Sequence, residues 1–180
     1  KLDKLVFEVT TNIENYDLGI ALDKIYNFIW NEFCDWYIEM VKPRIYSDNY
    51  EIKTNVCYIL NYVFGTALKL LHPFMPFVTT KIYSELVSYD NKDLMISNWP
   101  EVKKNFSFEN EEKLVEQLKE TIVEIRNVRA NMNIHPSKKS ELIFVSKSNK
   151  KELEQAKEFI LKLGFGNELK IQENKDGIKD

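Results

Sequence analysis

Residues 16–46, YDLGIALDKIYNFIWNEFCDWYIEMVKPRIY, carry the pattern of a long helix that is apolar around most of its circumference. Its main apolar stripe recurs at helical spacing and comprises Leu18, Leu22, Ile25, Ile29, Phe33, Trp36 and Met40. A second, aromatic stripe beside it comprises Tyr26, Trp30 and Tyr37. Such a helix is expected to lie centrally in a bundle, with Trp30 and Trp36 in structural positions, and Pro43 should end it or kink its last turn.

Three further helices are predicted around this one. Residues 1–13 read as the end of a helix that begins upstream, since nothing caps them and no Met starts the chain. A third helix is predicted from SDNYEIK (47–53), capped by Asp48, with Glu51 completing a capping box. Its expected buried stripe is Ile52, Val56, Ile59, Val63, Ala67 and Leu70. HPFMPF (72–77) should stop this helix and open a fourth, which runs to about Val87.

From about residue 90 the sequence pattern differs from that of the helical bundle. Residues 90–108 are predicted to be a linker laid across the bundle, with Trp99 tucked in. A helix (111–131), a strand (140–146), a helix (149–164) and a strand (168–173) follow. Asn149 with Glu152 predicts a capping box, and Gly164 a helix end. A strand–helix–strand order predicts two parallel strands.

The predicted fold class is therefore mainly α. An up-down helical bundle with its linker should cover residues 1–108, and a long helix with a small α/β appendage should cover residues 109–180.

Composition limits the possible functions. The chain has 180 residues and a net charge of −3, so any polyanion must bind a local patch rather than the bulk surface. Cys34 and Cys57 form no CxxC pair and read as two buried thiols in a reducing cytosol. The longest apolar run, 56–71, is too short and too interrupted to span a bilayer, so no membrane partner is expected.

Catalytic and metal-binding patterns are missing. His72 and His135 are the only histidines, and neither lies in a metal-ligand motif. The GFG at 164–166 lacks the third glycine of a dinucleotide loop and follows a helix rather than a strand. We therefore expect no catalytic residue, no metal and no cofactor in this chain.

A basic stretch is the leading candidate for a binding site. IRNVRANMNIHPSKK (125–139) holds two Arg, two Lys and a His without an acid. Arg126 and Arg129 lie one helical turn apart, ahead of a polar loop. Arg129 falls within the stripe of Leu118, Ile122, Ile125 and Met132, so it must either pair with a buried acid or lie on a presented face. The stretch is then either an RNA-binding loop or a cationic helix end that complements its own dipole.

A second basic patch is predicted at the end of the long helix. Lys42 and Arg44 lie there beside Tyr37 and Tyr46. Aromatic faces interleaved with cations suit a splayed anticodon loop.

Several of these stretches together resemble the anticodon-binding region of the valyl-tRNA synthetases, which are class I aminoacyl-tRNA synthetases. The matching segments are YDLGIALDKIYNFIWNEFCDWYIEMVKPRIY, LLHPFMPFVT, ISNWP and IRNVRANMNIHPSKK, in the family's order over about residues 5–145. FCDWYIE and PSKK favour the valine enzymes, and HPFMPF is shared with the isoleucine and leucine enzymes. Those two enzymes, and a non-catalytic helical scaffold for protein interactions, are the alternatives.

The resemblance implies a binding function within a larger cytoplasmic enzyme. The HIGH and KMSKS signatures are absent, so valine activation with ATP and Mg would occur in a catalytic domain elsewhere in the parent chain. This monomeric region would hold the anticodon stem-loop of tRNA(Val). The expected tRNA-binding residues are Lys42, Arg44, Arg126, Arg129, Asn133, His135, Lys138 and Lys139.

Overall fold

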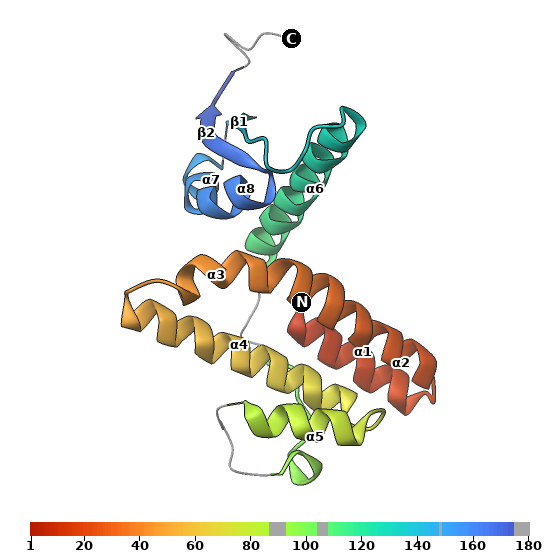
Figure 1. The fold of residues 1–180 in the computed structure, drawn as a ribbon. Coiled ribbons are helices and arrows are strands. Elements are labelled where there is room, and N and C mark those ends of the chain that lie inside the picture. The colour runs from red at the N-terminus through yellow and green to blue at the C-terminus, as the bar shows by residue number, and fades with distance from the viewer. Residues whose placement is uncertain (87–92, 104–107, 148, 175–180) are drawn as a thin grey trace. The chain divides into compact units, whose positions relative to one another are not determined.

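A computed structural model describes residues 1–86, 93–103, 108–147 and 149–174. The chain divides into two compact units, Lys1–Ser107 and Phe108–Asp180. The first consists of helices, and the second combines helices with two strands (Figure 1).

The first unit opens with a helical hairpin. Helix α1 (Leu2–Glu14) and helix α2 (Leu18–Asn27) are joined by a tight turn in which Tyr16 takes a positive φ of 62°. Two ion pairs support the antiparallel arrangement: Lys24 Nζ lies 2.9 Å from Glu8 across the hairpin, and Lys1 Nζ lies 2.6 Å from Glu32, in the helical stretch that continues α2. Because both pairs are partly exposed to solvent, they fix the register of the hairpin more than they stabilise it.

Helix α2 runs on into a π-helical stretch, η1 (Phe28–Ile38), and then into α3 (Glu39–Ile45). In a π-helix the backbone bonds run from i to i+5, so side chains five residues apart share a face. Phe28 and Phe33 are both buried, and Ile38 packs partly buried against the same core. Pro43 lies inside the helix, which continues to Ile45.

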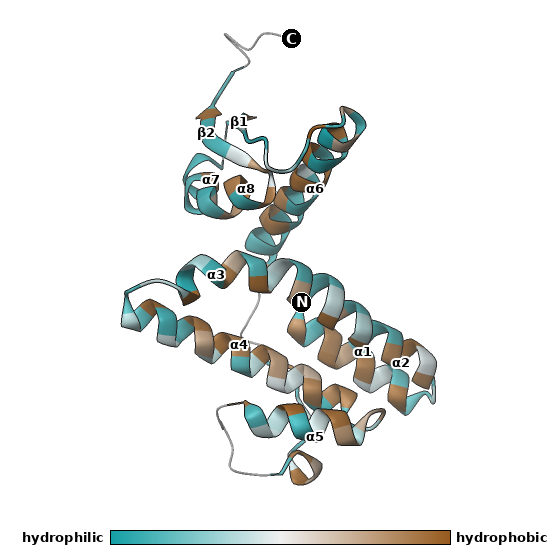
Figure 2. Ribbon diagram, in the orientation of Figure 1, coloured by the Kyte–Doolittle hydropathy of each residue, from teal (hydrophilic) through white to brown (hydrophobic). Residues whose placement is uncertain are grey.

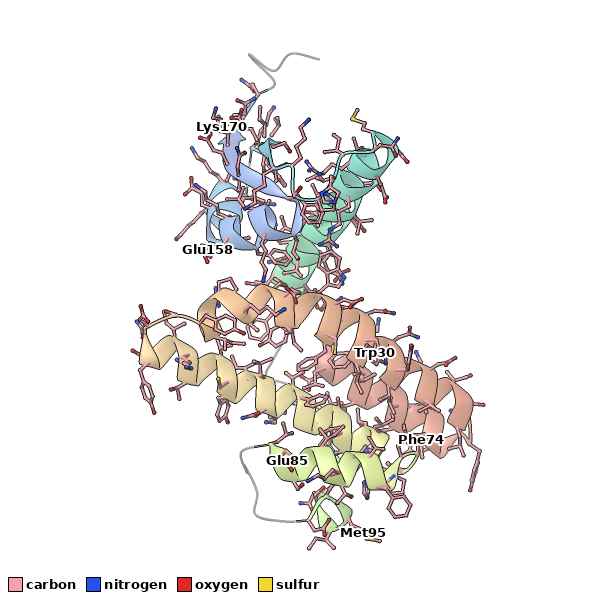
Figure 3. The ribbon with its side chains drawn as sticks, viewed as in Figure 1. Trp30, Phe74, Glu85, Met95, Glu158 and Lys170 are labelled. Atoms are coloured by element: carbon pink, nitrogen blue, oxygen red, sulfur yellow. The ribbon has the colours of Figure 1, made fainter. Side chains whose placement is uncertain are left out.

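The buried face of this long helix differs from the predicted one. Ala21, Ile25 and Phe28 face the core, whereas Leu18 is 51% exposed and Leu22 is also exposed. Trp30, expected in a structural position, is 53% exposed and contacts Tyr26 at 6.2 Å between ring centroids (Figure 3). Apolar residues surround the helix, so periodicity could not select the buried face, and the small Ala21 lies on the face that packs in the core.

Helix α4 (Tyr50–Leu71) follows and carries the opposite wall of the core. Asn49, and not the predicted Asp48, is its N-cap: the Asn49 side chain accepts from the amides of Glu51 and Ile52. Val56, Ala67 and Leu70 are buried as expected, but Ile52 and Ile59 are exposed. Figure 2 shows hydrophobic residues along α1, α2 and α4; those that form the core include Leu5, Val9, Ile25, Ala67 and Leu70.

Helix α5 (Pro76–Glu85) begins at Pro76 as predicted and ends at Glu85; Val87 lies outside the described residues. It is tied to the end of α4 by a 2.8 Å contact between His72 Nδ1 and the buried Thr79 hydroxyl. Of the predicted linker, residues 93–103 and Phe108 are described. They contain a short 3₁₀ helix, η2 (Leu94–Ile96), and Trp99, whose indole donates to the Thr10 hydroxyl at 2.8 Å.

The second unit contains α6 (Glu109–Asn131), β1 (Ser140–Val145), α7 (Lys150–Gln155), α8 (Lys157–Leu163) and β2 (Gly166–Gln172). The two strands are parallel, as predicted, with Leu142 paired to Leu169 and Phe144 to Ile171. Two short helices replace the single helix predicted for 149–164, and the Asn149 side chain makes no capping bond. The core of the second unit includes Leu118, Ile122, Leu142, Leu153, Phe159, Ile160, Leu163 and Leu169.

The predicted fold class is confirmed: a mainly α chain with helices in an up-down arrangement and a small parallel α/β appendage. Among the described residues, the helices are all too short or too polar to cross a lipid bilayer.

Candidate nucleic-acid interface

The end of helix α6 shapes the loop that follows it. The amide of Asn133 donates to the Ala130 carbonyl, and the amide of Ile134 donates to the Arg129 carbonyl. Together these bonds form a Schellman motif, which requires a left-handed residue after the helix. Asn133 supplies that residue with φ 53°, a conformation that asparagine tolerates better than most residues. Asn133 therefore ends the helix and redirects the chain.

The loop of residues 132–139, here called the basic loop, is folded by its own polar groups. His135 Nδ1 lies 2.8 Å from the Ser137 hydroxyl, and the Ser137 amide donates to the same nitrogen at 3.3 Å. The Lys138 amide donates to the His135 carbonyl at 2.9 Å, which closes a turn around Pro136. His135 is thus an exposed residue that also orders the turn.

The buried side chain of Arg129 holds the backbone of this loop in place. Its side chain is only 7% exposed, and the first guanidinium nitrogen donates to the Ser140 hydroxyl at 2.9 Å. The second donates to the carbonyls of Lys138 and His135. The sequence left two outcomes for Arg129, a buried acid partner or a presented face, and the structure has neither. The charge lies inward against backbone carbonyls, and its Nε has no partner among the described residues.

Arg126, one turn earlier, is partly buried and faces the appendage. Its Nε donates to the carbonyl of Leu163, the last residue of α8, at 2.8 Å. Both arginines of the stretch therefore make contacts within the second unit. For Arg129, which faces inward, this geometry does not support the expected direct contact with RNA.

The outer surface of the basic loop belongs to other residues. Lys138 and Lys139 are exposed, and their side chains form no ion pair with any described residue. Met132 and His135 are also exposed. Two unpaired ammonium groups on a braced turn form an arrangement suited to contacting phosphates.

The second predicted patch lies in the first unit, at the end of α3. Lys42 is partly buried and pairs with Glu39 one turn earlier, whereas Arg44 is exposed. Tyr37 is half-buried and packs near Phe33, so it belongs to the interior. Burial raises the pKa of its phenol, and the Arg44 charge offsets part of that rise.

Tyr50 was missed by the sequence reasoning. It is 81% exposed at the start of α4, just across the short connection from Tyr46, which is 79% exposed. The available signal was its position directly after the Asn49 cap, because the first turn of a capped helix is commonly solvated. The exposed members of this patch are thus Arg44, Tyr46 and Tyr50.

The described residues contain no group of three or more His, Cys, Asp and Glu side chains placed to hold a metal ion.

Comparison with known proteins fits this arrangement. Residues 1–144 match the family described as the anticodon-binding domain of tRNA ligase, and the chain belongs to that family. It is 42% identical over 177 residues to a valine–tRNA ligase of Clostridium acetobutylicum, and 40% identical over 179 residues to that of Clostridium perfringens. These matches cover 98% and 99% of the chain.

A more distant relative is the valine–tRNA ligase of Aquifex aeolicus, 35% identical over 176 residues and 91% of the chain. The chain spans 20% of the length of each Clostridium relative and 15% of the Aquifex one. The similarity to valine–tRNA ligases thus extends past residue 144, into the α/β appendage.

Proposed function

We propose that this chain is the tRNA-binding part of a valine–tRNA ligase and holds the anticodon stem-loop of tRNA(Val). Valine activation with ATP and Mg would take place in the catalytic domain of the same parent protein, in the cytoplasm. The domain would contribute binding energy that positions the tRNA, because orientation alone can supply a large part of a rate enhancement.

One observation carries the proposal: Lys138 and Lys139 are exposed, have no ion-pair partner among the described residues, and lie on a turn that the chain itself orders. A cationic helix end needs no such construction to complement its own dipole. The turn belongs to the region matched by the anticodon-binding family.

The two patches would contribute to tRNA binding in different ways. Lysines of the basic loop would contact phosphates, which gives affinity without reading sequence. Tyr46 and Tyr50 offer exposed rings on which unpaired anticodon bases could stack, and Arg44 lies two residues from Tyr46.

Filter binding of the 180-residue chain to a tRNA(Val) transcript at two salt concentrations tests this function. We expect affinity that falls steeply with salt, and weaker binding of a tRNA with another anticodon. A helical scaffold for proteins would bind no better than an equally acidic control protein, and that result would refute the proposal.

A further inference from the structure

The Gly164–Phe165–Gly166 turn, which fits no dinucleotide loop, contacts Ser140 and the two arginines that flank the basic loop in the fold. It joins the end of α8 to the start of β2. Phe165 takes a positive φ of 56°, an unusual conformation for a bulky residue without a local polar group to stabilise it. Such strain is maintained only where the surroundings enforce it, and it often marks a functional position.

Close packing disfavours a side chain at both glycines. A Cβ on Gly166 would lie 2.7 Å from Leu161 Cδ2 and 2.8 Å from Leu142 Cδ1. A Cβ on Gly164 would lie 2.9 Å from the Ile160 carbonyl oxygen and 3.0 Å from Leu142 Cδ1. A side chain is thus accommodated more easily at Phe165 than at either neighbouring glycine.

The Phe165 ring contacts both arginines of the basic stretch. The guanidinium carbons of Arg126 and Arg129 each lie 5.7 Å from the ring centroid, within cation–π range. The backbone joins the same group, since the Ser140 amide donates to the Phe165 carbonyl at 3.3 Å. Ser140 in turn accepts from Arg129 through its hydroxyl.

These contacts link Arg129, the basic loop, Ser140 and Phe165 into one connected network. Phe165 holds Arg129, Arg129 holds the carbonyls of the basic loop, and Ser140 returns from the end of that loop to Phe165. Arg126 is fixed on the same ring and on the Leu163 carbonyl.

We infer that Phe165 is a positioning residue for RNA binding: its ring orients Arg126 and Arg129 and thereby keeps the basic loop in the conformation that presents Lys138 and Lys139. The inference rests on the proposed function for its RNA part, whereas the ordering of the loop is independent of it. Phe165 acts through the arginines and makes no RNA contact itself.

Nuclear magnetic resonance of the 180-residue chain tests the ordering directly. In the wild type, the Nε–H signals of Arg126 and Arg129 should be displaced by the ring current, and that of Arg126, which donates to the Leu163 carbonyl, should exchange slowly. In Phe165→Leu, we expect that displacement to vanish and the amides of Ile134 and Lys138 to exchange about tenfold faster. Phe165→Tyr keeps the ring and should restore the wild-type behaviour.

Phe144→Leu is the matched control, because it removes a phenyl ring from β1 of the same unit. It should lower stability without altering the arginine signals. If Phe165→Leu leaves both the arginine signals and the loop exchange as in the wild type, the inference is wrong.

Filter binding completes the test. Phe165→Leu should bind the tRNA(Val) transcript about fivefold more weakly, and Phe165→Tyr as the wild type does. A loosened loop with unchanged affinity would also overturn the positioning role. Absence of salt-dependent binding by the wild type would instead reject the proposed function, while the exchange data would still decide whether Phe165 orders the loop.

Discussion

The Arg129 guanidinium lies over the Phe165 ring, 5.7 Å from its centroid, although 36 positions separate the two residues in the sequence. The same guanidinium donates to Ser140 and to two carbonyls of the basic loop. One buried cation thus connects the end of α6, the basic loop and the turn before β2.

Arg129→Lys should destabilise the second unit by about 1–3 kcal/mol, because an ammonium group cannot reach the hydroxyl and both carbonyls at once. Urea unfolding followed by far-ultraviolet circular dichroism measures the change. Tryptophan fluorescence is a useful contrast, since all three tryptophans (Trp30, Trp36 and Trp99) lie in the first unit. An unchanged dichroism transition would show that the lysine satisfies the loop equally well.

Replacing both exposed lysines of the basic loop, Lys138→Ala with Lys139→Ala, should weaken tRNA binding and reduce the salt slope by about one per lysine, with unchanged stability. Filter binding over a salt series measures the slope. The matched control is Lys150→Ala with Lys151→Ala, which replaces two consecutive exposed lysines at the start of α7. Equal losses from both pairs would mean that the charge acts by its number and not by its location.

Asn133 was expected to contact tRNA, and its left-handed backbone permits a clean separation of the two possible roles. Asn133→Gly removes the amide but suits φ 53°, so stability should change by only a few tenths of a kcal/mol. Asn133→Val should cost about 1–2 kcal/mol, because a β-branched residue resists that conformation. Should the glycine variant bind tRNA as the wild type does, Asn133 serves the helix end alone.

Gly166→Ala should destabilise the second unit by about 1–3 kcal/mol, since the added methyl would overlap Leu161 and Leu142. Gly19→Ala offers the contrasting control: nothing lies within 4 Å of its Cβ position in α2, and stability should rise by up to about 1 kcal/mol. Circular dichroism should report the first change and tryptophan fluorescence the second. A neutral Gly166→Ala would mean that the leucines move aside freely.

Tyr37 makes the stability of the first unit depend on alkaline pH. Burial raises its pKa above the ordinary 10.0, so the folded chain holds the phenolic proton more tightly than the unfolded chain does. Stability from this group is complete below about pH 10 and falls as pH rises further. Tyr37→Phe should flatten that fall in urea unfolding followed by tryptophan fluorescence. Tyr46→Phe, at an exposed position, should leave the fall unchanged.

Local signals in the sequence predict the structure well where a short motif decides the outcome. Pro76 opened α5 and the strand–helix–strand order gave a parallel pair, as predicted. The cap of α4 was displaced by one residue because Asp48 and Asn49 are both good capping residues, and the backbone decides between them. The π-helix was missed since an all-round apolar helix does not reveal its period.

The candidate site was harder to predict, because its order comes from contacts between distant segments. Sequence indicated that charge gathers at 126–139, and Lys138 and Lys139 are exposed there. It could not indicate that Arg129 turns inward, because Ser140 and Phe165 meet it only in the fold. The GFG turn was rejected as a nucleotide loop without a reason for its presence; packing against Leu142 and Leu161 supplies one.

The hydrogen bonds that shape the basic loop affect which of its residues can change during evolution. The Schellman motif uses main-chain groups. The hydrogen bonds to the His135 and Lys138 carbonyls come from Arg129, which lies outside the loop. The side chains of Met132, Lys138 and Lys139 take no part in either. If the basic loop binds RNA as proposed, substitutions at these three positions can change its affinity while folding is left intact, so that affinity and stability can evolve separately on one short segment.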